Sequence, residues 1–474
     1  MTSPARLATA PGPAASPPDQ RLTAIEELDY LLERPAEPSL VLWEVHCRGH
    51  LDRAALAGAV TAAFGADLGA GRRLAAAPRW GRRLYWRPVA PAPGGPLTEV
   101  SWRIPAELNA LRERLFAWPL SLTEAVARVV LAVGPEHDVV IIQVHHTAFD
   151  GVSSLRLLST ITQAYRARAT APHLHSVPDS PPVPGPLPHL DAPPSPPTSV
   201  TPAPSTPANT PATSRRGRAA AWPGTVTRIA RQGGQPGRPG YGFVLATVPV
   251  PRPISGGDGP RPTVNDLLVA ALCLAIDRWN TARGQVSGQI SVTVPVNGRA
   301  AAQRWQGDGN LSWLTRVVTG PSHRADPGLL LRHVATQTRL ARDRGRTHRT
   351  DTMSRLLATG WAPMVVKQRV ARLVRGLAAP LLTDTSLVSN LGLLPEAPTF
   401  DGSGTEPVWL APLCPMPKGL ALGAVSVAGR LCLSVRYRVA LLDRAAADDF
   451  TACFRAALGE LTRPGQGAPP EAPL

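Results

Sequence analysis

Several residue types that mark particular classes of protein are scarce in this chain of 474 residues. Aromatic side chains make up only 5% of it, and the 5 cysteines are far apart with no Cys-x-x-Cys pair: Cys47, Cys273, Cys414, Cys432 and Cys453. An odd number of widely spaced cysteines disfavours a disulfide framework, and none has a histidine at ligand spacing. We therefore predict neither disulfides nor a metal site.

Long apolar runs are missing as well. Residues 1–20 lack the apolar core of a secretion signal, and the longest apolar stretch, Leu267 to Ile276, is about half of what spans a bilayer. We expect a reduced, cytoplasmic protein without a transmembrane segment.

Lysine is nearly absent, since only Lys367 and Lys418 occur among 50 basic residues, against 34 acidic ones and a net charge of +16. The arginines are scattered and are not interleaved with aromatic residues, which disfavours nucleic acid as a partner. One interpretation is codon bias expressed on a solvated surface. The other is attraction of an anionic partner, such as a phosphorylated cosubstrate or an acidic carrier protein.

Proline, in contrast, is abundant, and 16 of the 53 prolines lie between Pro172 and Pro223, where no hydrophobic periodicity is present. Such a segment cannot bury enough apolar area to offset its ordering entropy. The predicted organisation is a disordered tail at 1–20, an N-terminal subdomain at 21–170, a Pro-rich disordered linker at 171–224, a C-terminal subdomain at 225–462 and a disordered tail at 463–474.

Both subdomains mix helical and strand patterns, which predicts an α/β fold. In the first, helices are expected at 22–32 and 51–64, strands at 40–45, 125–133 and 139–144, and a helix after a cap at Ser153 or Ser154. In the second, helices are expected at 263–280, capped by Thr263 or Asn265, and at 364–378, with strands at 290–296, 386–389, 424–427 and 431–438. Lys367, Arg369 and Arg372 make the segment 364–378 basic and amphipathic, which leaves a peripheral membrane or carrier contact open beside an ordinary packed helix.

The most specific signal is the sequence HHTAFDG at 145–151, which directly follows the strand predicted at 139–144. A histidine at the end of a buried strand is held rigidly, and its usual pKa suits a general base near neutral pH. Gly151 leaves room for a ligand or for backbone close by. The alternative is a pair of half-buried polar residues that close the sheet. A buried Asp150 needs a cationic partner and is therefore more architectural than catalytic.

HHTAFDG resembles the HHxxxDG motif of chloramphenicol acetyltransferase-like acyltransferases, nonribosomal peptide condensation domains, polyketide-associated acyltransferases and wax ester synthases. The resemblance extends over nearly the whole folded chain. Four further segments carry it: LTAIEELDYLLER at 22–34, NDLLVAALCLAIDRW at 265–279, TVPVNGRA at 293–300 followed by Gly309-Asn310, and SLVSNLGLLPE at 386–396.

The resemblance implies two chloramphenicol acetyltransferase-like α/β subdomains that form a V-shaped pseudo-dimer with a central tunnel. It implies that His146 is the general base, that His145 supports it, and that Asp150 forms a structural ion pair with Arg299. Gly151 completes the motif, and Ser389 and Asn390 are expected to bind substrate.

Some features of these families are missing. The DFGWG motif of condensation domains is replaced by a run from Phe400 to Gly404, and no adenylation or carrier signature is present. We therefore expect a stand-alone bacterial acyltransferase of secondary or lipid metabolism, which moves an acyl group from acyl-CoA or an acyl carrier protein to a hydroxyl or amine of a small-molecule acceptor, with no bound cofactor. Peptide-bond-forming condensation and a catalytically silent accessory protein remain the alternatives.

Overall fold

The computed structural model describes residues 19–462 apart from 35–36, 67–68, 77–79, 90–96, 171–225, 253–260, 301–302, 308, 346–359, 361 and 383. The linker predicted at 171–224 and the tail predicted at 463–474 lie outside these described residues, as does most of the predicted N-terminal tail.

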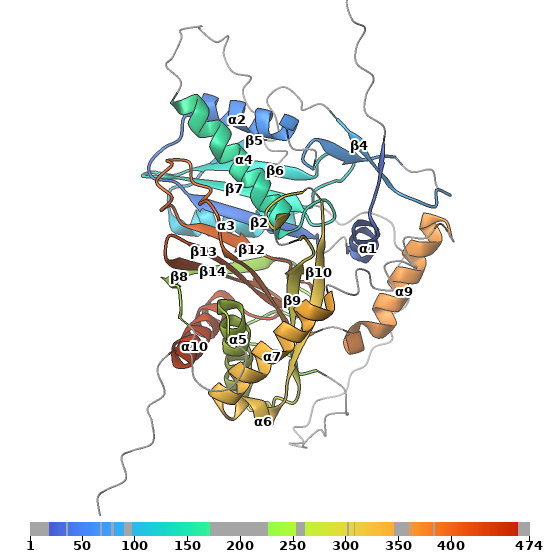
Figure 1. Ribbon diagram of the computed structural model, residues 1–474, viewed down its shortest axis with the longest axis vertical. Helices are drawn as coiled ribbons and strands as arrows, with labels where there is room; N and C mark the ends of the chain where they lie inside the picture. The colour runs from blue at the N-terminus through green and yellow to red at the C-terminus, as the bar shows by residue number, and fades with distance from the viewer. Residues whose placement is uncertain are drawn as a thin grey trace, which may run out of the picture.

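A five-stranded sheet forms the centre of the N-terminal half, and helices cover both of its faces (Figure 1). Its strand order is β12-β2-β7-β6-β5, with bounds β2 Leu40–His46, β5 Leu97–Ser101, β6 Ala127–Val133, β7 Asp138–His145 and β12 Val408–Ala411. One face carries α2 (Arg53–Ala66) and α4 (Gly151–Ala169), and the other carries α3 (Pro105–Ala117). Because side chains alternate along a strand, Ile142 of β7 packs beneath α4 while Ile141 packs beneath α3.

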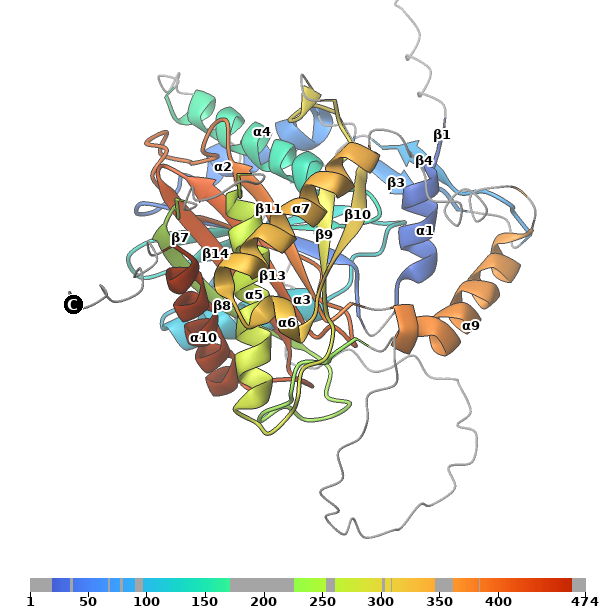
Figure 2. The ribbon, with the colours of Figure 1, turned by 60° about the horizontal axis from the view of Figure 1, so that its bottom comes forward.

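The C-terminal half contains a six-stranded sheet of order β10-β9-β11-β13-β14-β8. Its strands are β8 Tyr241–Pro249, β9 Ile290–Asn297, β10 Ser312–Thr319, β11 Ser386–Leu393, β13 Leu420–Val427 and β14 Arg430–Arg438. Its helices α5 (Val264–Thr281), α7 (Pro327–Gly345) and α10 (Arg444–Thr462) lie together on one face, beside the short α6 (Pro321–Arg324) (Figure 2). The opposite face meets the N-terminal half, where Phe243 of β8 stacks on Phe116 of α3 with ring centroids 4.2 Å apart.

The chain crosses between the halves near its C-terminal end. β12 pairs antiparallel with β2, so residues 408–411 extend the N-terminal sheet, which the division at residue 225 did not anticipate. Arg436 of β14 reinforces the junction, because its buried guanidinium donates to the carbonyl oxygens of Leu40 at 2.9 Å and Pro412 at 2.8 Å. The two halves are therefore packed against each other through backbone pairing and buried side chains.

A smaller layer lies to one side, where α1 (Ala24–Leu32) contacts α9 (Met364–Leu382). The three-stranded sheet β1-β4-β3 (Gln20–Arg21, Tyr85–Pro88 and Arg72–Leu74) completes this layer. Lys367 belongs to the segment predicted as basic and amphipathic at 364–378, but its side chain is buried. Its Nζ lies 3.6 Å from Oε2 of Glu27 on α1. Among the described helices, none is long and apolar enough to cross a bilayer.

The local predictions succeed wherever periodicity is strong. The hairpin of β6 and β7, the Thr263 cap of α5 and the helix α9 are confirmed. The cap predicted at Ser153 or Ser154 is wrong, because α4 begins at Gly151 and Asp150 is its N-cap. A carboxylate accepts the unpaired N–H groups of the first helical turn, so the helix begins directly after the motif.

Candidate active site

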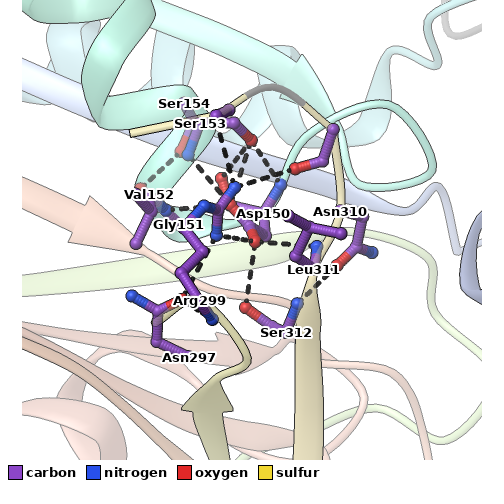
Figure 3. Close-up of polar contacts among 12 residues, drawn as sticks. Asp150, Gly151, Val152, Ser153, Ser154, Asn297, Arg299, Asn310, Leu311 and Ser312 are labelled. Atoms are coloured by element: carbon purple, nitrogen blue, oxygen red, sulfur yellow. Dashed lines mark hydrogen bonds and ion pairs between the residues drawn. The ribbon is translucent and has the colours of Figure 1, made fainter. Parts of the chain in front are cut away.

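The motif HHTAFDG forms the loop from β7 to α4, and it lies where the two halves meet (Figure 3). Its first residues are held by backbone hydrogen bonds: the His146 N–H donates to the Ser39 carbonyl at 2.7 Å, and the Ala148 N–H donates to the His145 carbonyl at 2.9 Å. From the C-terminal half, the end of β9 and the start of β10 approach the loop.

Asp150 joins the halves through its two carboxylate oxygens. Oδ1 accepts from the N-terminal half, namely from the N–H groups of Val152 at 3.1 Å and Ser153 at 2.9 Å and from the Ser153 hydroxyl at 3.0 Å. Oδ2 accepts from the C-terminal half, namely from Nη1 of Arg299 at 2.6 Å, the Leu311 N–H at 3.0 Å and the Ser312 hydroxyl at 3.2 Å. The carboxylate therefore has donors on both oxygens and no access to substrate.

Arg299 and Asp150 are an ion pair whose side chains are 2% and 1% exposed. Two other nitrogens of the Arg299 guanidinium donate to backbone carbonyls, Nε to Gln306 at 2.8 Å and Nη2 to Gly309 at 3.2 Å. Burial alone favours the neutral carboxyl of Asp150, but the hydrogen bond and charge of Arg299 outweigh it and hold its pKa below the usual 3.8.

His146 keeps part of its ring accessible, with 24% of the side chain exposed. Its Nδ1 lies 3.2 Å from Oδ2 of Asp29, which belongs to α1. Asn310, just before β10, places its amide Nδ2 2.6 Å from the same carboxylate oxygen and 3.2 Å from the His146 carbonyl oxygen. Three segments far apart in the sequence therefore meet around one imidazole.

Opposing effects act on the pKa of His146. Burial lowers it, but the hydrogen bond with Asp29 and the charges of Asp29 and Asp150 are stronger together and raise it above the usual 6.5. A partly exposed histidine with a carboxylate beside one ring nitrogen has the arrangement of a general base.

His145 is placed differently, since its side chain is only 1% exposed. Its Nδ1 accepts from the Thr147 N–H at 3.2 Å, and its Nε2 lies 3.1 Å from Oε1 of Glu33, the residue that ends α1. Both ring nitrogens are therefore occupied inside the protein, so this ring supports the loop and has no nitrogen left for a substrate proton.

The other predicted site residues have distinct positions. A Cβ built on Gly151 would lie 3.0 Å from Cδ2 of Leu391 on β11, so the glycine allows close approach of the two halves. Ser389 and Asn390 lie on the same strand, and Oδ1 of Asn390 accepts from the Gly392 N–H at 2.8 Å. Among the described residues, neither side chain bonds to His146, and their role in substrate binding stays a prediction.

Asp29, Glu33 and Asn310 were not predicted as site residues. Asp29 and Glu33 occur in a helix rich in acidic residues, where nothing local separates a site carboxylate from a solvated one. Asn310 did fall in a segment that carries the family resemblance, but without an assigned role.

Comparisons with known proteins address the fold. No protein-family model matches the chain. An uncharacterized protein of Mycobacterium tuberculosis is 27% identical over 450 residues, which cover 92% of this chain and 98% of that protein.

Solved structures match nearly the full length. A variant of the starter condensation domain of rhizomide synthetase, in complex with C8-CoA and Leu-SNAC, has a TM-score of 0.58 at 12% identity and covers 94% of this chain and 96% of its own. The first condensation domain of the calcium-dependent antibiotic synthetase, in complex with a substrate analogue, has a TM-score of 0.57 at 15% identity. The match covers 94% of this chain and 97% of that domain. An epimerization domain of tyrocidine synthetase B has a TM-score of 0.52 at 14% identity, and the match covers 94% of this chain and 96% of that domain.

The chain therefore has the condensation-domain fold. The predicted fold class, an α/β protein of two chloramphenicol acetyltransferase-like subdomains, is confirmed over 94% of the chain. At these identities the likeness establishes architecture, and the chemistry has to be argued from the site itself.

Proposed function

We propose that this protein is an acyltransferase that moves an acyl group from a thioester to a hydroxyl or amine, with His146 as the general base. The observation that carries the proposal is the His146 ring, which Asp29 holds at Nδ1 and which remains partly accessible at the junction of the halves. The donor is acyl-CoA or an acyl carrier protein, and the acceptor is a small molecule.

In the proposed reaction, Nε2 of His146 takes the proton of the acceptor as its oxygen or nitrogen attacks the thioester carbonyl carbon. The carbonyl oxygen becomes an oxyanion in a tetrahedral intermediate. When the intermediate collapses, the carbon–sulfur bond breaks, and the thiolate leaves and takes the proton back from the imidazolium. The products are an ester or amide and a free thiol, and the histidine ends as it began.

Direct transfer without an acyl-enzyme fits the cysteines of this chain. A cysteine acts as a nucleophile through its thiolate, which needs a lowered pKa. Burial instead raises the pKa of all five thiols, those of Cys47, Cys273, Cys414, Cys432 and Cys453. No thiol of the chain is therefore activated for covalent catalysis.

Peptide-bond formation between two carrier-bound substrates is the second candidate, and the fold shared with condensation domains supports it. It uses the same base and the same bond changes, but it requires an amine acceptor that is itself a thioester. In either case we place the reaction in the cytoplasm and expect no bound cofactor.

The proposal is tested by incubating the full chain with acyl-CoA thioesters of graded chain length or with acyl-pantetheinyl carriers, in the presence of alcohol and amine acceptors. Mass spectrometry follows the products, and a thiol reagent follows thiol release. We expect thiol release to depend on the acceptor and to equal ester or amide formation. Thiol release at the same rate without acceptor would indicate a hydrolase, and no turnover with any donor would favour the catalytically silent alternative.

The pH dependence should follow His146. A general base must be neutral to take a proton, so kcat/KM should be low in acid, rise with pH through the raised pKa of His146, and level off above it. The midpoint is expected above pH 6.5, and measurements between about pH 5 and 9 would locate it. A midpoint below 6.5 would contradict the assigned effect of Asp29.

A further inference from the structure

We infer that Asp29 is a positioning residue, which holds the His146 ring in the Nδ1–H tautomer and stabilises the imidazolium formed when Nε2 takes a proton, and that Asn310 from the other half completes this arrangement. The inference rests on the proposed function for its kinetic consequences. Its structural part concerns only the state of one imidazole and can be measured without substrate.

The orientation of the Asn310 amide follows from its neighbours. Its Nδ2 faces two atoms that can only accept, Oδ2 of Asp29 at 2.6 Å and the His146 carbonyl oxygen at 3.2 Å, and it also lies 3.2 Å from Nδ1 of the His146 ring. Its Oδ1 accepts from the Ser312 N–H at 3.3 Å. A flipped amide would set oxygen against two acceptors, so the nitrogen must point toward Asp29 and His146.

This orientation decides the tautomer of His146. Nδ2 of Asn310 also lies 3.2 Å from Nδ1 of His146, but its two hydrogens are taken by the two oxygen acceptors, which leaves none for Nδ1. The carboxylate of Asp29, 3.2 Å from Nδ1, accepts hydrogen bonds and does not donate them. A lone pair on Nδ1 would face the lone pairs of the carboxylate, whereas a hydrogen there forms a bond. Nδ1 therefore carries the hydrogen, and Nε2 has the lone pair that a general base needs.

The charges around His146 favour the imidazolium. The acidic groups that act on it are Asp29 from α1 and Asp150 from the N-terminus of α4. The charge of Asp150 is balanced by Arg299 at 2.6 Å, whereas Asp29 has the neutral Asn310 as its other partner. Asp29 is consequently the group whose charge most directly offsets the positive charge that develops on the ring.

The junction of the two halves also enters the arrangement. The segment that carries Asn310 continues into Leu311 and Ser312, which both bond to Oδ2 of Asp150. Docking of the halves thus places Asn310 and secures the motif loop at the same time, so the oriented base exists only in the assembled protein.

The first test measures His146 directly by NMR of the full chain labelled with ¹⁵N-histidine, with the His146 signals assigned by their loss in His146→Gln. We expect the Nδ1–H tautomer and a pKa above 6.5 in the wild type. Asp29→Asn preserves the shape and removes the charge, so the pKa of His146 should fall by about one unit. Asp29→Ala also removes the acceptor, so the other tautomer should become populated.

Glu33→Gln is the matched control, because Glu33 terminates the same helix but contacts His145 at 3.1 Å. It should leave the pKa and tautomer of His146 unchanged. An unchanged His146 pKa in Asp29→Asn, or an Nε2–H tautomer in the wild type, would overturn the inference.

The second test uses the pH profile of acyl transfer. In Asp29→Asn the acid limb of kcat/KM should move to lower pH by the shift that NMR measures, with KM for the thioester within about twofold of the wild type. Asp29→Ala and Asn310→Ala should lower kcat by roughly 10- to 10³-fold through loss of ring orientation. An equal loss at every pH in Asp29→Asn, without a shift, would mean that Asp29 only supports the fold. If the wild type transfers no acyl group, the proposed function fails while the NMR result still decides the role of Asp29.

Discussion

His146→Ala is expected to lower kcat for acyl transfer by roughly 10²- to 10⁴-fold, which is the usual contribution of a general base. The melting temperature should stay close to that of the wild type, because the side chain is 24% exposed and its loss leaves Asp29 hydrogen-bonded to Asn310. Steady-state kinetics with the thioester identified in the donor screen, together with thermal unfolding, measure both quantities. Turnover within twofold of the wild type would remove His146 from the mechanism.

His145→Ala is the matched comparison, because the two histidines are adjacent in sequence and opposite in environment. The His145 ring is 1% exposed and bonded at both nitrogens, so its removal leaves a cavity and takes away the contact with Glu33. We expect a loss of roughly 2 kcal/mol or more in the free energy of unfolding. His146→Ala should therefore lower kcat with little effect on stability, whereas His145→Ala should lower the free energy of unfolding.

The largest loss of stability is expected from the ion pair between the halves. Asp150→Ala leaves the buried Arg299 guanidinium without its counter-charge and also removes the N-cap of α4, and breaking such a pair costs about 3–5 kcal/mol. Arg299→Ala should cost a similar amount. Denaturant unfolding followed by circular dichroism gives both values.

A double-mutant cycle separates the pair from its surroundings. The Asp150→Ala/Arg299→Ala protein should lose less than the sum of the single variants, because neither charge remains to be left unpaired. Arg278→Ala is the control, since Arg278 and Glu460 are 2.6 Å apart but each 43% exposed, and its effect should stay under about 1 kcal/mol. Single variants at 150 and 299 that unfold like the wild type would mean that the pair does not hold the halves together.

Acid should weaken the same junction. Because the folded protein lowers the pKa of Asp150, its charge contributes stability that is fully present above pH 3.8 and is lost as the pH falls further through the lowered value. Asp150→Asn has no charge to lose, so the stability difference between it and the wild type should shrink as the pH decreases below this value.

Local features of the chain were predictable because their causes are local. The β-branched run of β7, the capping box of Thr263 and the apolar spacing of α5 each act within a few residues, and the structure contains all three features. The N-cap of α4 was misplaced by a few residues for a physical reason. Asp150 was considered as a member of an ion pair, and a carboxylate can fulfil that role and cap a helix at the same time.

Local sequence patterns could not predict how many strands the second sheet has or that β12 pairs with β2 of the N-terminal sheet. Strand pairing joins segments that are remote in sequence, so residues 408–411 show nothing that assigns them to β2 and not to β13. Only the shape of the packed halves decides which sheet edge is available to them.

By itself the sequence determined the α/β class, most of the helices and strands, and the position of His146 at the end of a buried strand. The tertiary structure decided which groups surround that histidine. Asp29 lies 117 residues from His146 along the chain and Asn310 lies 164 residues away, and no periodicity or spacing links them. Their meeting requires α1, the motif loop and β10 to dock together, and that arrangement depends on how the two hydrophobic cores pack against each other.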